Sequence, residues 1–108
     1  MVGIYKGGIV LPKIYKGIKT TAFHPSCKVE ELLERYDMTF LDLIRKENIP
    51  ILKMRRFMKG LIGIDSEIAY LLSRKLNTSI NLWLNLQKKY KKDLSKAKEE
   101  NKNANIRS

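Results

Sequence analysis

The sequence predicts a small all-α domain built from five short helices. Apolar residues recur at helical spacing through the middle of the chain, and capping residues, glycine and proline separate these apolar runs. A chain of 108 residues is also the size of a single domain. We therefore expect an extended N-terminal arm over residues 1–23, a helical domain over 24–92, and a basic, polar tail over 93–108.

Two helices are expected in the first half of the domain. The first begins at Ser26, which can cap it, and its apolar face consists of Val29, Leu32, Leu33 and Tyr36. The second spans residues 39–47, with Thr39 as its N-cap and Asp42 three positions later as an approximate capping box. It should end at Asn48-Ile49-Pro50, because asparagine tolerates a left-handed turn and proline excludes the preceding residue from helix.

Three further helices follow with equally clear stops. The third is expected over residues 50–59, closed by Gly60. The fourth should start at Asp65 and end at Asn77, and the fifth should start at Ser79. Their apolar stripes are Ile68, Leu71, Leu72 and Leu76, and then Leu82, Trp83, Leu86 and Tyr90. The second and third helices, joined by a short turn, have the layout of a helix-turn-helix domain.

The two ends of the chain give weaker signals. In the arm, glycine and proline oppose a helix while isoleucine, valine and tyrosine favour strand, so either a short hairpin or no fixed structure is expected. Beyond Lys91, lysine, glutamate and asparagine dominate, and we expect a frayed helix or a disordered tail.

The chain is strongly basic. Twenty-two Lys and Arg against eleven Asp and Glu give a net charge of +11 and a pI near 9.9, which is typical of nucleic-acid binders but also of proteins with a lysine-rich surface. Residues 48–60 carry four bases and no acid. On a helical wheel, Arg55, Arg56 and Lys59 share one side with Leu52, opposite Met54, Phe57 and Met58. A recognition helix needs this division into a basic face and an apolar face.

Several function classes are disfavoured by composition. The single Cys27 and the single His24 are too few for a metal site or an oriented nucleophile, so we expect no enzyme, no metal and no cofactor, and assign both residues to the start of a helix. No window is apolar enough to cross a membrane, and no secretory signal is recognised. With no internal disulfide available, a cytoplasmic location is expected.

The most specific pattern lies near the C-terminus, where Ser79-Ile80-Asn81-Leu82-Trp83-Leu84-Asn85-Leu86-Gln87 is followed by Tyr90. Together with His24-Pro25 and Lys59-Gly60-Leu61, this pattern resembles the HigA/VapI-type antitoxins of the Xre group. The resemblance covers about residues 24–90 and implies a lambda-repressor-like helix-turn-helix fold. It also implies a homodimeric, DNA-binding antitoxin of a type II toxin–antitoxin pair. Such an antitoxin neutralises a small basic RNase toxin of the HigB/RelE type and represses its own operon.

The resemblance and the basic helix together define candidate site residues. Those expected at DNA are Thr39, Phe40, Ile51, Leu52, Lys53, Arg55, Arg56 and Lys59. Phe40 stands where the family often has glutamine, and Ile51 and Leu52 stand where polar residues usually open the recognition helix, so sequence readout is expected to be altered, reduced or lost.

The apolar run at residues 82–84 is wider than one helix face, so a partner subunit is expected to contact part of it. The residues assigned to the dimer interface are Leu82, Trp83 and Leu86, with Trp83 in either the core or the dimer contact. Two alternative functions stay open: a protein-interaction inhibitor that has lost operator recognition, and a stand-alone Xre-type transcriptional repressor.

Overall fold

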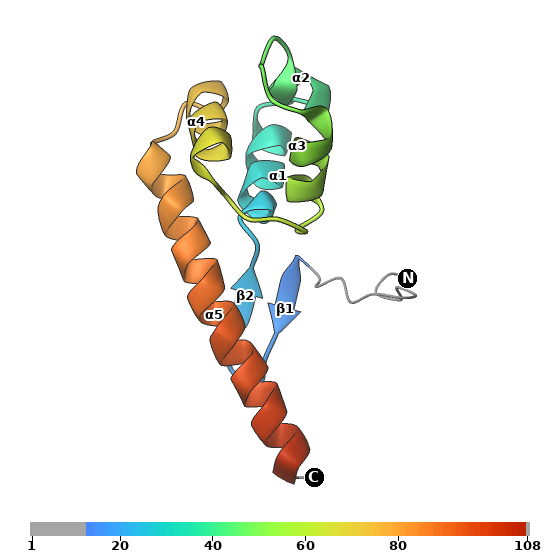
Figure 1. The fold of residues 1–108 in the computed structure, drawn as a ribbon, viewed down its shortest axis with the longest axis vertical. Coiled ribbons are helices and arrows are strands. Elements are labelled where there is room, and N and C mark those ends of the chain that lie inside the picture. Colours follow the sequence, from blue (N-terminus) through green and yellow to red (C-terminus); the bar gives the residue numbers. More distant parts are fainter. Residues whose placement is uncertain (1–12, 108) are drawn as a thin grey trace.

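The computed structural model describes residues 13–107, and within that range it contains five helices and one two-stranded antiparallel sheet (Figure 1). In chain order the elements are β1 Ile14–Lys16, β2 Thr21–Phe23, α1 Ser26–Arg35, α2 Phe40–Ile44, α3 Ile51–Met58, α4 Ser66–Lys75 and α5 Ile80–Arg107. The expectation of a mainly helical chain is confirmed, but the all-α class was incomplete because it left out the sheet.

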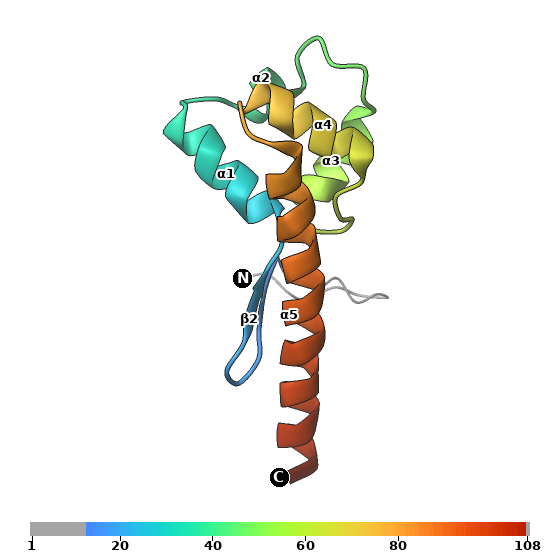
Figure 2. The same ribbon diagram turned by 90° about the vertical axis from the view of Figure 1, so that its left-hand side faces the viewer.

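The molecule has a head and a rod. Helices α1 to α4 gather with the start of α5 in the head, and α5 then runs well past them with the β1–β2 hairpin along its side (Figures 1 and 2). We call the part of α5 from residue 88 onward, together with this hairpin, the rod. The longest dimension of the molecule is 52 Å, against 24 Å for the shortest.

The helix boundaries follow local capping chemistry. Thr39 and Asp42 form the expected capping box, with the Asp42 N–H donating to the Thr39 hydroxyl at 3.1 Å and the Thr39 N–H donating to the Asp42 carboxylate at 2.9 Å. Gly60 has a φ of 81° and closes α3, and Asn77 has a φ of 53° just after α4. The end of α2 was wrongly predicted: the helix stops at Ile44 instead of residue 47, because Arg45 leaves the helical region with a ψ of 130°. The left-handed residue that follows is Lys46, not Asn48.

The start of α1 also differs from the expectation. Pro25 occupies the N-cap position with no side-chain cap, and Ser26 is the first helical residue. The Ser26 hydroxyl lies 2.8 Å from Nδ1 of His24 instead of capping the helix. The predicted helix-start role therefore falls to His24, whose Nδ1 accepts the Ser26 N–H at 3.0 Å.

The core lies between the head helices and the first half of α5. Most of the expected apolar positions are buried there: Val29, Leu32, Leu33, Leu43, Met54, Phe57, Ile68, Leu71, Leu72, Leu76 and Trp83. Tyr36 was wrongly placed on the apolar face of α1, because it follows the last helical turn and is 47% exposed. The Trp83 indole is fully buried and donates to the Thr78 hydroxyl at 2.7 Å, so its polar group is satisfied inside the chain.

The arm contains the hairpin that was one of its two expected forms, and residues 1–12 lie outside the described part of the chain. Strands β1 and β2 pair Ile14 with Phe23, Tyr15 with Ala22, and Lys16 with Thr21. Ala22 is fully buried and Tyr15 half-buried, whereas Ile14 and Phe23 are exposed. The Tyr15–Ala22 face of the sheet therefore covers α5.

The expected polar tail from residue 93 is instead continuous helix to Arg107. Glu100 fixes it to the hairpin turn, accepting the Lys19 and Thr20 N–H groups at 2.9 and 3.0 Å and the Thr20 hydroxyl at 2.7 Å. The Asn101 amide donates to the Lys16 carbonyl at 3.0 Å. Gly17 permits the close approach, since a Cβ there would lie 2.7 Å from the Cα of Ala97.

His24 joins the head to the rod. Its ring is 1% exposed, and because Nδ1 accepts an N–H, the proton resides on Nε2, which donates to the Ile62 carbonyl at 2.8 Å. The ring packs edge-on against Tyr90 of α5, with 5.1 Å between centroids, and against Phe57 of α3, at 5.3 Å. Burial lowers the pKa of His24 below its ordinary value of 6.5, so the fold selects the neutral imidazole.

This selection predicts a stability that depends on pH near neutrality. The unfolded chain takes up the His24 proton at a higher pH than the folded chain does. The contribution of neutral His24 to the free energy of unfolding is therefore fully present above the ordinary pKa of 6.5. This contribution is lost as the pH drops from 6.5 toward the lower pKa of the folded state. Urea unfolding between about pH 5 and 7.5 should show this slope, and His24→Gln should flatten it. The shifted carboxylates, Asp42, Glu47, Asp65 and Glu100, all have lowered pKa values and titrate below this window. An unchanged slope in His24→Gln would contradict the assignment.

Candidate nucleic-acid interface

Helix α3 has a buried apolar face and an exposed basic face, as the sequence predicts. Met54 and Phe57 are fully buried, while Arg55, Arg56 and Lys59 are exposed on the outer side of the helix. Ile51 and Leu52 are also exposed, at 46% and 55%. The first turn of α3 therefore presents apolar side chains to solvent, and the following turns present cations.

Arg55 is held by an aromatic ring from the preceding helix. Its guanidinium carbon lies 5.2 Å from the centroid of the Phe40 ring, within the range of a cation–π contact. Phe40 is the first residue of α2, and the Thr39–Asp42 capping box fixes that end of the helix. Phe40 therefore restricts Arg55, and the Thr39 hydroxyl already accepts a hydrogen bond within its own chain.

Lys53 is placed differently from the other three cations of α3. Its ammonium lies 2.6 Å from Asp65 and 2.5 Å from Glu67, at the start of α4, and these two hydrogen bonds raise the pKa of Lys53. The charge is therefore neutralised by acids of the next helix. Arg56 and Lys59, by contrast, form no ion pair with any residue in the described range 13–107.

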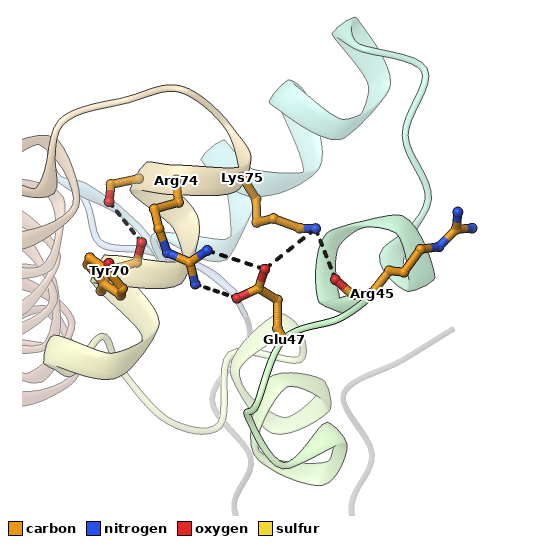
Figure 3. Close-up of polar contacts among 6 residues, drawn as sticks. Arg45, Glu47, Tyr70, Arg74 and Lys75 are labelled. Carbon is orange, nitrogen blue, oxygen red and sulfur yellow. Dashed lines mark hydrogen bonds and ion pairs between the residues drawn. The ribbon is translucent and has the colours of Figure 1, made fainter.

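The turn between α2 and α3 is fastened to α4 by Glu47 (Figure 3). Arg74 reaches the Glu47 carboxylate with both terminal nitrogens, and Lys75 lies 3.6 Å from it while also donating to the Arg45 carbonyl at 3.1 Å. The Arg74 guanidinium stacks over Tyr70 at 4.6 Å. Hydrogen bonding by Arg74 lowers the pKa of Glu47, whose side chain is only 10% exposed. This contact sets where α3 starts relative to α4.

These ion pairs leave the exposed face of α3 positive. The acids nearest to α3 in the sequence are each paired: Asp42 with Arg45, Glu47 with Arg74 and Lys75, and Asp65 and Glu67 with Lys53. No pairing with an acid offsets Arg55, Arg56 or Lys59 among the residues described. A polyanion approaching this face would meet three cations and a short apolar turn.

The residues expected at a dimer interface lie mostly inside the chain. Trp83 is fully buried, and Leu82 and Leu86 are half-buried against the core. The apolar side chains that α5 does expose in this region are Ile80, at 42%, and Leu84, at 37%. Of the predicted run at residues 82–84, Leu84 is therefore the member that faces outward.

The contacts that support this face could not be found from the sequence. Lys53 was grouped with Arg55 because both lie in a run without acids, and only the fold reveals that Asp65 and Glu67 return to it. Glu47 gave no signal because its partners lie 27 and 28 positions later. Polar residues at an element boundary are the available hint, and Glu47 is such a residue.

Comparison with protein-family models, with curated proteins and with solved structures finds no match to this chain. Among residues 13–107 no helix is long and apolar enough to cross a membrane. In the same range, no group of three or more His, Cys, Asp or Glu side chains is arranged to hold a metal ion.

The Glu47 contact predicts a measurable loss of stability. Glu47→Gln removes the carboxylate charge from two cations at a position that is nearly buried, so the thermal midpoint should fall. Glu34→Gln is the matched control, because Glu34 is exposed and forms no ion pair within the described range. The shift for Glu47→Gln should be several times that of the control. Equal shifts in a thermal-unfolding experiment would show that Glu47 does not anchor the turn.

Proposed function

We propose that this chain is a DNA-binding protein of the helix-turn-helix type, with α2 and α3 as the helix-turn-helix pair and α3 as the recognition helix. The observation that carries the proposal is the exposed face of α3, which has three cations without an acid partner, in the described chain, behind a fully buried apolar face. A helix of this kind fits the major groove, where arginine can bond guanine and both arginine and lysine can bond phosphate.

The cellular role that we propose is that of an antitoxin and autorepressor, and it rests on the HigA-like pattern at residues 79–90. A lambda-repressor-like arrangement and a homodimer belong to the same proposal. Because Trp83 is buried, the dimer contact is assigned to Leu84 and Ile80 at the outer side of α5. A stand-alone repressor would share the DNA surface and differ only in having no toxin partner.

The second candidate is a protein-interaction inhibitor that does not bind DNA. Exposed apolar side chains on α2 and at the start of α3 favour it: Leu41 is 59% exposed, Leu52 55% and Ile51 46%. Apolar groups cannot hydrogen-bond base edges, although they can contact a thymine methyl group, and exposed apolar side chains are also typical of protein contacts. DNA binding itself therefore discriminates between the two candidates.

The first prediction for DNA is a strong dependence of affinity on salt with modest sequence selectivity. Fluorescence anisotropy with a labelled mixed-sequence duplex, between about 50 and 200 mM salt, gives the slope of log K against log salt. If Arg56 and Lys59 contact phosphates, Arg56→Gln and Lys59→Gln should each reduce this slope by about 0.9.

Lys28→Gln is the control for net charge, because Lys28 is already paired with Glu31, and it should leave the slope unchanged. A wild-type protein that binds no duplex even at low salt would refute the proposal. The inhibitor hypothesis would then be tested by co-purification with the product of the neighbouring gene.

The second prediction concerns Phe40. If its ring holds Arg55 for the groove, Phe40→Leu should weaken duplex binding by roughly two- to fivefold, as expected for an exposed cation–π contact of about 0.5–1 kcal/mol. Leucine keeps the apolar contact with the core, so stability should change little. The double variant Phe40→Leu/Arg55→Gln should bind no more weakly than Arg55→Gln alone. Additive losses would mean that Phe40 acts independently of Arg55.

A further inference from the structure

The rod carries an excess of positive charge that is separate from the cations of α3, the proposed recognition helix. Between residues 88 and 102, α5 has seven lysines and three acids. Four of these lysines recur at intervals of three, seven and four residues: Lys88, Lys91, Lys98 and Lys102. We call these four the lysine row.

The acids of the rod do not neutralise the lysine row. Asp93 is paired with Lys89, at 2.7 Å, and Glu100 is occupied by the N–H and hydroxyl groups of the hairpin turn. Of the three acids between residues 88 and 102, Glu99 is the one left without such a contact in the described chain. The members of the lysine row are all exposed, and none of them pairs with an acid among residues 13–107.

The row is straight and lies on one side of α5. At 100° per residue its four members fall within an arc of about 80°, displaced from the face on which Tyr90 and Ala97 are buried. Lys88 and Lys102 are fourteen positions apart, which is about 21 Å along the helix axis at 1.5 Å per residue. One strand of B-DNA presents about six phosphates over that length of axis.

The hairpin holds this helix in a form that its sequence opposes. Lysines four apart, such as Lys98 and Lys102, repel one another in a helix, and a lysine-rich segment with few apolar residues would ordinarily stay unfolded. Contacts made by Ala97, Glu100 and Asn101 with the hairpin compensate for this repulsion. The fold therefore orders a self-repelling row of cations, whereas a solvated tail would need no such support.

We propose that the lysine row binds the phosphate backbone of duplex DNA, as a second contact surface beyond α3. The proposal rests on the DNA-binding function proposed above and extends its footprint along the rod. Charge complementarity with a regular polyanion supports it. A bilayer fits less well, because Ser95 is the only other residue between Lys88 and Lys102 within that arc, and the nearest apolar side chain of the segment, Leu94, is half-buried about 40° outside it.

The test compares three variants of the full chain on one labelled mixed-sequence duplex. The row variant is Lys91→Gln/Lys98→Gln/Lys102→Gln, and the matched control is Lys13→Gln/Lys28→Gln/Arg35→Gln, whose three cations are paired with Glu30 or Glu31. The third, Arg56→Gln/Lys59→Gln, removes the cations of α3. Glutamine and lysine have similar helix propensities, and circular dichroism checks that helicity is retained.

The row variant should lower the salt slope by about 0.9 for each phosphate that no longer has a lysine partner, and the control should leave the slope unchanged. Restoring the charges with Lys91→Arg/Lys98→Arg/Lys102→Arg should restore the slope. A wild-type slope in the row variant, together with a reduced slope in the α3 variant, overturns this inference and leaves the proposed function intact. The reverse result supports the row and refutes α3. Binding by the wild type to vesicles of phosphatidylcholine and phosphatidylserine, but not to duplex, overturns both.

Discussion

The relative placement of α3 and the rod depends on one buried imidazole. His24 contacts the start of α1 through Ser26, the loop after α3 through the Ile62 carbonyl, and α5 through the ring of Tyr90. Its backbone N–H donates to the Lys13 carbonyl, which joins it to the hairpin as well. Both ring nitrogens are satisfied only when Nε2 carries the single proton, because a proton on Nδ1 would face the Ser26 N–H. Only the neutral His24 ring with its proton on Nε2 is thus compatible with these contacts. The packing of the head and the packing of the rod therefore depend on the same protonation state.

Acids and cations have different roles in the structure. In the described chain, acids near α3 and in the rod are mostly engaged in structural contacts: Asp42 in a cap, Glu47 at a turn, and Glu100 on the hairpin. Several cations of the described chain have no acid partner, among them those on the outer face of α3 and in the lysine row. These two groups form surfaces of different shape, a short helix face and a long row.

Local signals were predictable from the sequence, and contacts between distant segments were not. The Thr39–Asp42 box, the glycine cap at Gly60 and the stop at Asn77 each depend on a few neighbouring residues, so the five helices could be placed. The order of the C-terminal segment depends on Glu100 meeting Thr20 across 80 positions. Its composition alone predicted a frayed helix or a disordered tail, since the interactions that overcome the repulsion are polar or involve glycine and alanine. Lys53 was wrongly grouped with the free cations of α3 for the same reason, because its partners Asp65 and Glu67 belong to a later segment.

The apolar start of α3 limits what else can occupy that face. Ile51 and Leu52 are followed closely by Arg55 and Arg56, so a protein that covered the two apolar side chains would need an acidic rim. The basic toxin that the antitoxin proposal implies would lack that complementarity and would be repelled there. At the end of α1, Glu34 and Asp37 form no ion pair in the described chain, whereas Glu30 and Glu31 are paired with Lys13, Lys28 and Arg35. Under the proposed antitoxin role, a basic toxin would therefore bind away from the outer face of α3, and its binding would leave the three cations of that face available to DNA.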